Sequence, residues 1–481
     1  MKRILNIETI KYLGKKVKVC GWVNSRRDHG GIVFLDLRDR SGILQIVSKP
    51  DLVKEIKEEY VLEIEGTVQK RPLKMVNKEL ETGEVELQAE QIRVLVKSEV
   101  LPFDFKNKDS VSTLSLPTLL DYRPLTIRNE KIKAIFKVSA EVVDSFRRTL
   151  KNLDFVEFQS PNIVPVAAEG GAEIFHIDYY DYDAYLAQSP QLYKQIMLGV
   201  FERVFTVTHV YRAEPSITTR HLSEYTSLDT EMAFINSWED LIDTCEILIK
   251  SILTDVQKDC QKELSLFNAE IPDLKVKIPR LKMREAQKII FERTGRDNRK
   301  EPDLEPEDER EICKFAKDKY NSEFIFITHY PTKKRPFYTY PDPKDIDHTL
   351  SFDLLYRGLE IVTGGQRIND YEMLVKNIKK WGNDVKDFAF YLQAFKYGIP
   401  PEGGFALGAE RIVKQLLGLE NIREATPFPR DTERIDQRLS LLQKRKKTKT
   451  KLFSRLKSMA FQTSKLSARR ETKEGRMVSS I

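Results

Sequence analysis

Residues 210–234 read VYRAEPSITTRHLSEYTSLDTEMAF. Apolar strand patterns at the two ends of this segment enclose a loop that carries Arg212, Glu214, Arg220 and His221. Guanidinium groups bind phosphate through fixed bidentate forks, so two arginines and a histidine on one loop indicate a site for a polyphosphate. From this segment alone, the alternative is a hairpin held together by surface salt bridges.

A second segment, residues 351–374, reads SFDLLYRGLEIVTGGQRINDYEML. Asp353 and Glu360 could converge from neighbouring strands and hold Mg2+ against phosphates, because this ion takes few protein oxygens plus substrate oxygens. Arg367 follows two glycines and could meet a carboxylate substrate. Each feature taken alone is equally compatible with a structural role.

A third segment, residues 405–418, reads FALGAERIVKQLLG. Glycine precedes Glu410 and Arg411 at the start of an apolar helix pattern. Backbone that a ligand can approach closely, followed by a guanidinium at a helix N-terminus, suits a nucleotide. Glycine near a helix start is common, so this motif is weak in isolation.

The surrounding sequence predicts an α+β domain over residues 129–430. Helical spacing of apolar residues alternates there with short strand patterns. Helices are expected at residues 132–150, 238–259, 282–293 and 306–319, and strands at 155–166, 204–212, 324–329 and 351–356.

The N-terminal part has a different pattern. Five short alternating runs lie between residues 17 and 96 and are separated by turn-rich pieces such as DHGG and DRSG. They predict an OB-fold β-barrel over residues 1–100, followed by a hinge over residues 101–128.

The positive charge is concentrated in the C-terminal tail. The chain has 481 residues and a net charge of +7; residues 431–481 hold 15 Lys/Arg and 5 Asp/Glu, which gives +10 and leaves −3 for the rest. This charge allows two interpretations of the tail. It is either a solvated or disordered segment, or a segment that attracts RNA. Residues 1–430 have no net positive charge, so any nucleic-acid binding by this part of the chain must come from local basic patches.

Composition excludes several other classes. No stretch approaches the roughly 20 apolar residues that span a bilayer, and the N-terminus does not resemble a signal peptide, so a cytoplasmic protein with no membrane role is expected. The four cysteines are scattered without a CxxC pair, which argues against a zinc knuckle or a disulfide framework.

Together the three segments resemble motifs 2 and 3, and the strand between them, of class II aminoacyl-tRNA synthetases. Within that class, GGQRINDYEML, the TTRHLSEYTSLDTEM part of the first segment and QSPQLYKQ at residues 188–195 resemble aspartyl-tRNA synthetases, with the asparaginyl enzymes as the nearest alternative. The resemblance covers residues 17 to about 430 and implies a catalytic domain with an antiparallel sheet flanked by helices. LDYRPLTIRN at residues 120–129, with Pro161, stands where the motif 1 dimer interface of the family lies, which implies a homodimer.

The resemblance implies an enzyme that activates L-aspartate with ATP and transfers it to the 3′ end of tRNA. Arg212 would grip the aspartate carboxylate and the α-phosphate, and Arg411 would cover the adenine; these two are the expected catalytic residues. The implied ATP-binding set is Arg212, Glu214, Arg220, His221, Leu222, Tyr225, Glu360, Gly408, Ala409, Glu410 and Arg411.

The family pattern also implies a metal site and an aspartate pocket. Asp353, Glu360 and Thr363 would hold Mg2+; the family often has serine at the last position. The implied aspartate-binding residues are Glu169, Gln191, Lys194, Arg212, Thr363 and Arg367. Lys194 and Arg367 would pair with the substrate side-chain carboxylate, and asparagine would leave these two cations poorly paired, which is costly in a buried site.

Residues 21–47, GWVNSRRDHGGIVFLDLRDRSGILQIV, resemble the anticodon-binding barrel of the family. Phe34 would stack on an anticodon base, and Arg27 and Gln45 would address base edges and backbone. The alternative for Phe34 is a core phenylalanine. His29 stands where family members that also charge the asparagine tRNA often carry histidine, so we hypothesise that the protein accepts both tRNA(Asp) and tRNA(Asn).

The catalytic half lacks the large bacterial insertion and resembles archaeal and eukaryotic members, whereas the barrel looks bacterial. Two rival functions remain at this point. One is an asparaginyl-tRNA synthetase, and the other is a non-catalytic paralogue that binds RNA. The first leaves Lys194 and Arg367 facing a neutral amide, and the second has no need for a full set of ATP-binding residues.

Overall fold

The computed structural model describes residues 1–104, 111, 113–166, 173–215 and 218–442. The chain forms two compact units, one of Met1–Leu119 with Pro124–Glu130 and one of Leu120–Arg123 with Lys131–Ile481. The expected domain boundaries at residues 100 and 128 stay predictions.

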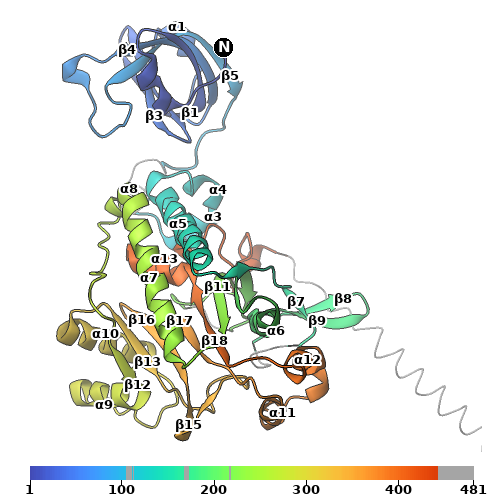
Figure 1. Cartoon of the computed structure of the whole chain (residues 1–481). Helices are drawn as coiled ribbons and strands as arrows, with labels where there is room; N and C mark the ends of the chain where they lie inside the picture. Colours follow the sequence, from blue (N-terminus) through green and yellow to red (C-terminus); the bar gives the residue numbers. More distant parts are fainter. Residues whose placement is uncertain (105–110, 112, 167–172, 216–217, 443–481) are drawn as a thin grey trace, which may run out of the picture. The chain divides into compact units, whose positions relative to one another are not determined.

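The first unit contains a closed five-stranded barrel, which confirms the expected OB-fold (Figure 1). Its strands are β1 (Lys16–His29), β2 (Ile32–Asp39), β3 (Gly42–Ser48), β4 (Val61–Lys70) and β5 (Val85–Val96), arranged in the order β1-β2-β3-β5-β4. Short helical pieces accompany them: η1 (Asn6–Tyr12), α1 (Pro50–Val53) and η2 (Leu73–Met75).

Alternation along the strands builds the barrel core. Val19, Leu35, Leu37 and Leu62 are fully buried, while the residues between them face outward. Each such side chain contributes about 1.5–3 kcal/mol on burial. Gly66 lets β4 approach β5, because a Cβ there would lie 2.2 Å from the carbonyl oxygen of residue 88.

The second unit is built on an eight-stranded sheet with the order β12-β13-β16-β17-β18-β11-β10-β6 (Figure 1). The strands are β6 (Val156–Glu157), β10 (Arg203–Tyr211), β11 (Glu224–Ala233), β12 (Arg280–Lys282), β13 (Phe324–Thr328), β16 (Ser351–Tyr356), β17 (Leu359–Gln366) and β18 (Glu402–Gly408). The edge pairs β12–β13 and β10–β6 are parallel and the others are antiparallel. This sheet with its helices confirms the expected α+β fold.

Helices α5 (Glu130–Asn152), α7 (Glu239–Asp259) and α13 (Ala409–Leu417) pack against the sheet through one large apolar cluster. The buried face of α5 carries Val138, Val142, Phe146 and Leu150 at helical spacing. The other helical elements of the described chain are α3 (Leu116–Asp121), α4 (Arg123–Thr126), α6 (Gln191–Phe201), α8 (Gln261–Ser265), α9 (Met283–Thr294), α10 (Pro306–Tyr320), α11 (Tyr371–Lys380), η3 (Val385–Phe388), α12 (Ala389–Lys396), η4 (Ile422–Glu424) and η5 (Leu439–Leu441).

Two small sheets complete this unit, β7 (Ile163–Val164) with β8 (His176–Tyr179) and β9 (Tyr182–Leu186), and β14 (Pro341–Asp342) with β15 (Asp345–Thr349). The predicted strand over residues 155–166 is wrong in extent. Only Val156–Glu157 and Ile163–Val164 pair, in different sheets, because Pro161 between them has no N–H for a ladder.

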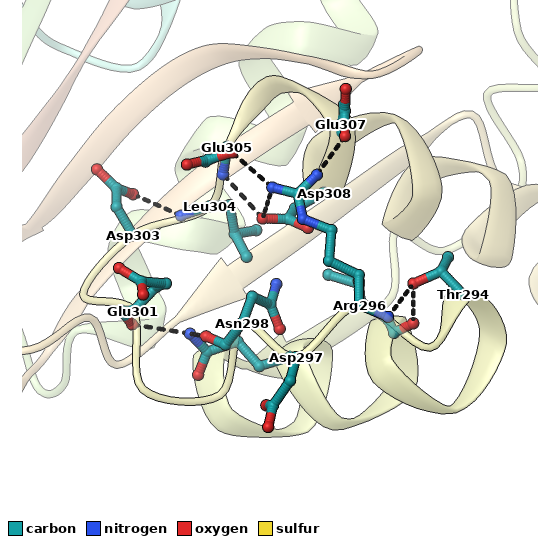
Figure 2. A network of polar contacts seen from close by, with 12 residues as sticks. Thr294, Arg296, Asp297, Asn298, Glu301, Asp303, Leu304, Glu305, Glu307 and Asp308 are labelled. Atoms are coloured by element: carbon teal, nitrogen blue, oxygen red, sulfur yellow. Dashed lines mark hydrogen bonds and ion pairs between the residues drawn. The ribbon is translucent and has the colours of Figure 1, made fainter.

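The connection between α9 and α10 is held by a polar network around Arg296 (Figure 2). The Arg296 guanidinium contacts the carboxylates of Glu305, Glu307 and Asp308. Asp308 in turn accepts a hydrogen bond from the Glu305 N–H at 3.0 Å and satisfies the N-terminus of α10. This network fixes the start of α10, from which Glu309 contacts Arg220 and Glu360, two residues that line the cavity described below.

The first part of the basic tail is attached to the second unit. Arg434 and Arg438 both pair with the Asp121 carboxylate, and Arg434 is buried. The remainder, residues 443–481, lies outside the described residues, so both readings of that part stay open. None of the described helices has the length and apolarity needed to cross a bilayer.

Candidate active site

A cavity of about 210 Å3 lies where β11, β17 and β18 meet the start of α13. Ten of the eleven predicted ATP-binding residues line it: Arg212, Glu214, Arg220, His221, Leu222, Tyr225, Glu360, Gly408, Glu410 and Arg411. The eleventh, Ala409, is packed in the apolar core and does not line the cavity. Sequence positions from 212 to 411 are therefore brought together at one place.

The hairpin of β10 and β11 positions the first segment. Arg212 follows β10, and its N–H donates to the Ser223 carbonyl at 2.9 Å, so the loop is tied at its base. The Arg212 guanidinium lies over the Tyr225 ring, 5.8 Å from the centroid. The Glu410 carboxylate accepts the Thr226 N–H at 3.0 and 3.2 Å, so this residue joins α13 to β11.

Two arginines of the predicted ATP-binding set hold protein carboxylates in this structure. Arg220 contacts Glu309, whose Oε2 also accepts the Glu360 N–H at 3.2 Å. Arg411 lies 3.3 Å from Glu360 Oε1 and donates to the Glu360 carbonyl at 2.9 Å. Burial raises the pKa of Glu309 to about 7, and Glu360 adds to the rise against the opposing effect of Arg220.

Glu309 has no counterpart among the predicted site residues. It stands in the acidic first turn of α10, where a carboxylate is already explained by the helix dipole. Its distance of 89 residues from Arg220 leaves no local signal in the sequence.

The structure makes His221 a neutral side chain. Burial, followed by the charges of Arg411, Arg220 and Arg212, lowers its pKa to about 4. Its Nδ1 lies 2.8 Å from Thr218 Oγ1. A neutral imidazole can make a hydrogen bond, and the negative charge of a bound phosphate would favour the protonated form.

The predicted metal ligands divide into two groups. Glu360 and Thr363 line the cavity, whereas Asp353 does not. Asp353 Oδ1 instead accepts from Thr363 Oγ1 at 2.6 Å and from the Arg335 guanidinium at 2.8 Å, and Arg335 stacks 3.9 Å from the Tyr330 ring centroid. In the described residues no three His, Cys, Asp or Glu side chains form a metal cage. One carboxylate and one hydroxyl at this cavity fit Mg2+, because that ion takes most of its ligands from water and from a substrate's phosphates.

Three of the predicted aspartate-binding residues meet in a buried cluster. Lys194 Nζ lies 2.8 Å from Asp229 Oδ1 and 3.1 Å from Glu231 Oε2, and its side chain is inaccessible to solvent. Arg367 Nε donates to Glu231 Oε1 at 3.0 Å, and Gln191 bridges Glu231 and Arg367 at 3.1 and 3.3 Å. A substrate carboxylate would therefore share both cations with protein carboxylates.

The cluster adjoins the cavity along β11. Tyr225 and Ser227 line the cavity, and Asp229 and Glu231, two and four residues further on the same strand face, hold the cluster. The Ser227 hydroxyl contacts the Asp229 carboxylate directly. The other predicted aspartate ligands, Arg212 and Thr363, line the cavity itself, and Glu169 lies outside the described residues.

The barrel presents Phe34 on its outer face. Val33 and Leu35 are buried in the core, and Phe34 between them is half-buried with the His29 ring against it edge to face at 5.5 Å. The alternative that Phe34 is a core residue is therefore wrong. An aromatic ring on a barrel surface is available for stacking on a base.

Arg27 and Gln45 share this face with Phe34. Arg27 is the cross-strand partner of Phe34 and forms a bidentate pair with Asp36 at 2.9 and 3.0 Å. Gln45 lies opposite Asp36 and donates to Glu86 Oε2 at 3.1 Å. Asp36 and Glu86 were not predicted from the sequence. They add two hydrogen-bond acceptors to the face.

Two family models match the chain. Residues 115–432 match the model described as tRNA synthetases class II (D, K and N), and residues 17–95 match an OB-fold nucleic acid binding domain. The chain belongs to the class II tRNA synthetases of the D, K and N group. As a member of this family it is an aminoacyl-tRNA ligase.

The curated relatives narrow the position within the family. The aspartate--tRNA(Asp/Asn) ligase of Deinococcus radiodurans is 43% identical over 441 residues, covering 90% of this chain and 99% of that one. The enzyme of the same name from Thermus thermophilus is 44% identical with the same coverage. The aspartate--tRNA(Asp) ligase of Thermococcus kodakarensis is 39% identical over 88% of this chain and 96% of its own. The chain is thus placed among aspartate–tRNA ligases.

Solved structures agree with this fold. The asparaginyl-tRNA synthetase of Pyrococcus horikoshii complexed with asparaginyl-adenylate aligns with a TM-score of 0.81 and 32% identity, covering 88% of this chain and 97% of that one. The aspartyl-tRNA synthetase of Entamoeba histolytica aligns with a TM-score of 0.79 and 29% identity, covering 90% and 93%.

Proposed function

We propose that the protein activates L-aspartate with ATP and transfers the aspartyl group to the 3′ end of tRNA(Asp) and tRNA(Asn). The observation that supports this most directly is the arrangement along β11, where a cavity rich in arginine adjoins a buried cluster with Lys194 and Arg367. An amino acid bound at the cluster and a nucleotide bound in the cavity would lie next to each other along β11.

The chemistry follows from positioning and charge. The aspartate α-carboxylate attacks the α-phosphorus in line and pyrophosphate leaves, while Arg212 compensates the charge that grows on the transferring group. The 3′-terminal ribose hydroxyl of the tRNA then attacks the carbonyl of the aspartyl-adenylate; the new ester bond forms, the hydroxyl loses its proton, and the bond to AMP breaks so that AMP leaves. Neither step needs a protein nucleophile. Mg2+, held by Glu360 and Thr363, would neutralise phosphate charge when bound, and Asp353 would support Thr363.

Selection of aspartate is attributed to Lys194 and Arg367. Their N–H donors face carboxylate oxygens at 2.8–3.1 Å in the cluster, a geometry that a second carboxylate can also use. An amide in its place would direct two N–H donors at cations. This disfavours the asparaginyl reading, although asparaginyl enzymes share the fold.

The acceptance of two tRNAs is proposed from the barrel. His29 packs on Phe34 at the face expected to meet the anticodon, and the Deinococcus and Thermus relatives are named as ligases for both tRNAs. We further propose that the protein acts as a homodimer in the cytoplasm. A monomeric mass in solution would contradict the dimer.

Charging assays with purified tRNA(Asp) and tRNA(Asn), labelled aspartate or asparagine, ATP and Mg2+ test the proposal. Aspartate is expected on both tRNAs, with kcat/KM values within about tenfold, a difference of about 1.4 kcal/mol. A preference of about a thousandfold for one tRNA, or about 4 kcal/mol, would reject dual specificity but leave aspartate activation intact.

Replacing Phe34 by alanine is expected to raise the KM for tRNA about tenfold or more, because base–aromatic stacking contributes about 1–3 kcal/mol. Steady-state aminoacylation gives the KM. Aspartate-dependent ATP–pyrophosphate exchange without tRNA should be unchanged. The exposed Val94 on β5, a strand that does not pair with β2, is a control, and Val94→Ala should alter the KM by less than about twofold. An equal loss in exchange would mean that Phe34 acts through folding.

A further inference from the structure

A buried carboxyl group, Glu402, lies behind the aspartate pocket and has no role in the function proposed above. It begins β18 and is inaccessible to solvent. Its Oε1 accepts a hydrogen bond from Gln195 Nε2 at 2.6 Å, and Gln195 Oε1 accepts one from the Tyr391 hydroxyl at 3.0 Å. Its carbonyl oxygen accepts the Arg367 N–H at 2.9 Å. Glu402 is therefore attached to the pocket through Arg367.

The second oxygen of this carboxyl group needs a proton. Glu402 Oε2 is buried and has no hydrogen-bond donor among the residues that the structure describes. Glu402 pairs with Ala233 across the sheet, and Glu231 stands two residues before Ala233 on the same face of β11, so the two buried carboxyl groups are neighbours and ionising both is costly. Lys194 and Arg367 hold Glu231 ionised, at 3.1 and 3.0 Å, so the proton belongs on Glu402. Burial, followed by the charge of Glu231, accordingly raises the pKa of Glu402 well above its ordinary value.

The proton decides the charge of the pocket. The cluster holds two cations, Lys194 and Arg367, and three carboxyl groups, Asp229, Glu231 and Glu402. With all three carboxyl groups ionised the cluster would carry one net negative charge and repel the side chain of aspartate. With a proton on Glu402 it is neutral, and the two cations can take a further carboxylate.

We propose that Glu402 is a specificity-determining residue that stays protonated and so keeps the pocket able to accept the negatively charged side chain of the substrate. The inference rests on the aspartate–tRNA ligase function proposed above. Glu402 acts through Glu231 and Arg367 as a positioning residue. The charged and titratable groups that face it are Glu231 on β11, Arg367 after β17 and Tyr391 on α12, whose own pKa is raised by burial.

Infrared difference spectroscopy on the full-length enzyme tests where the proton is. At about pH 8, well above the ordinary carboxyl pKa, the wild type minus Glu402→Gln difference is expected to show the carbonyl band of a protonated carboxyl group. A difference showing only an ionised carboxylate band would overturn the proposal. The subtraction removes other buried carboxyl groups, which both proteins share.

Kinetics of aspartate-dependent ATP–pyrophosphate exchange test the consequence. Glu402→Gln keeps the shape and the neutral charge, so the KM for aspartate should stay within about threefold of wild type. Glu402→Ala leaves the Gln195 Nε2 group without its acceptor and should raise that KM about tenfold or more, a loss that the glutamine variant does not show. If glutamine fails as badly as alanine, the residue works as a carboxylate and the proposal is wrong. Absence of exchange in the wild type would instead reject the function itself.

Discussion

Replacing Arg212 by alanine is expected to lower the kcat of aspartate-dependent ATP–pyrophosphate exchange by about 10²–10³-fold, the usual effect of removing one preorganised donor to a charge that develops in the transition state. Arg212 is the predicted residue common to the nucleotide and aspartate sets, and it lies at the cavity over the Tyr225 ring. Arg212→Lys keeps a charge but loses the planar fork, so most of the defect should remain.

The control for this variant is Arg203→Ala at the other end of β10. That guanidinium donates to the Leu153 carbonyl at 3.0 Å and does not line the cavity. Its kcat should stay within about twofold of wild type, as for an ordinary surface substitution. Near-normal exchange by Arg212→Ala would exclude Arg212 from the chemistry and move the reaction away from this cavity.

Replacing Lys194 by methionine is expected to do two things at once. The free energy of unfolding should fall by about 3–5 kcal/mol, because Asp229 and Glu231 would be left as buried carboxylates with one cation fewer. The KM for aspartate should rise by about 100-fold or more, because the substrate carboxylate loses its hydrogen-bonded ion pair with Lys194, an interaction that contributes about 3 kcal/mol to binding. Urea unfolding and pyrophosphate exchange measure the two effects separately.

The double variant Lys194→Met with Asp229→Asn separates stability from binding. Removing one carboxylate together with the cation should recover a large part of the lost stability, while the KM for aspartate stays high. Recovery of aspartate affinity together with stability would show that Lys194 acts only through folding, and the assignment of the pocket would fail.

The residues of the cavity proposed to bind ATP could be predicted from local motifs, because most of them stand in three short segments whose strand and helix patterns are clear. The aspartate cluster could be predicted only in part. Lys194 and Arg367 were predicted, but their partners Asp229 and Glu231 were given no role, although their spacing of two on a strand puts both on one face. The same alternation in residues 32–39 would have placed Phe34 outside the barrel.

Other contacts have no local signal. Glu309 reaches Arg220 from α10, Arg335 reaches Asp353 from a loop, and Glu402 meets Gln195 from β18. Each of these residues is of an ionisable type in a sequence where 32% of residues are Asp, Glu, Lys or Arg, and only the tertiary packing distinguishes it from a solvated surface residue. Their burial is the observation that gives them a role.

The most direct test of the central claim is ATP–pyrophosphate exchange by the full-length protein with aspartate or asparagine as the only amino acid. The account predicts rapid exchange with aspartate and a kcat/KM for asparagine lower by about 10³-fold or more, corresponding to at least about 4 kcal/mol for two cations left facing an amide. Equal or faster exchange with asparagine, or no exchange with either amino acid, would contradict it.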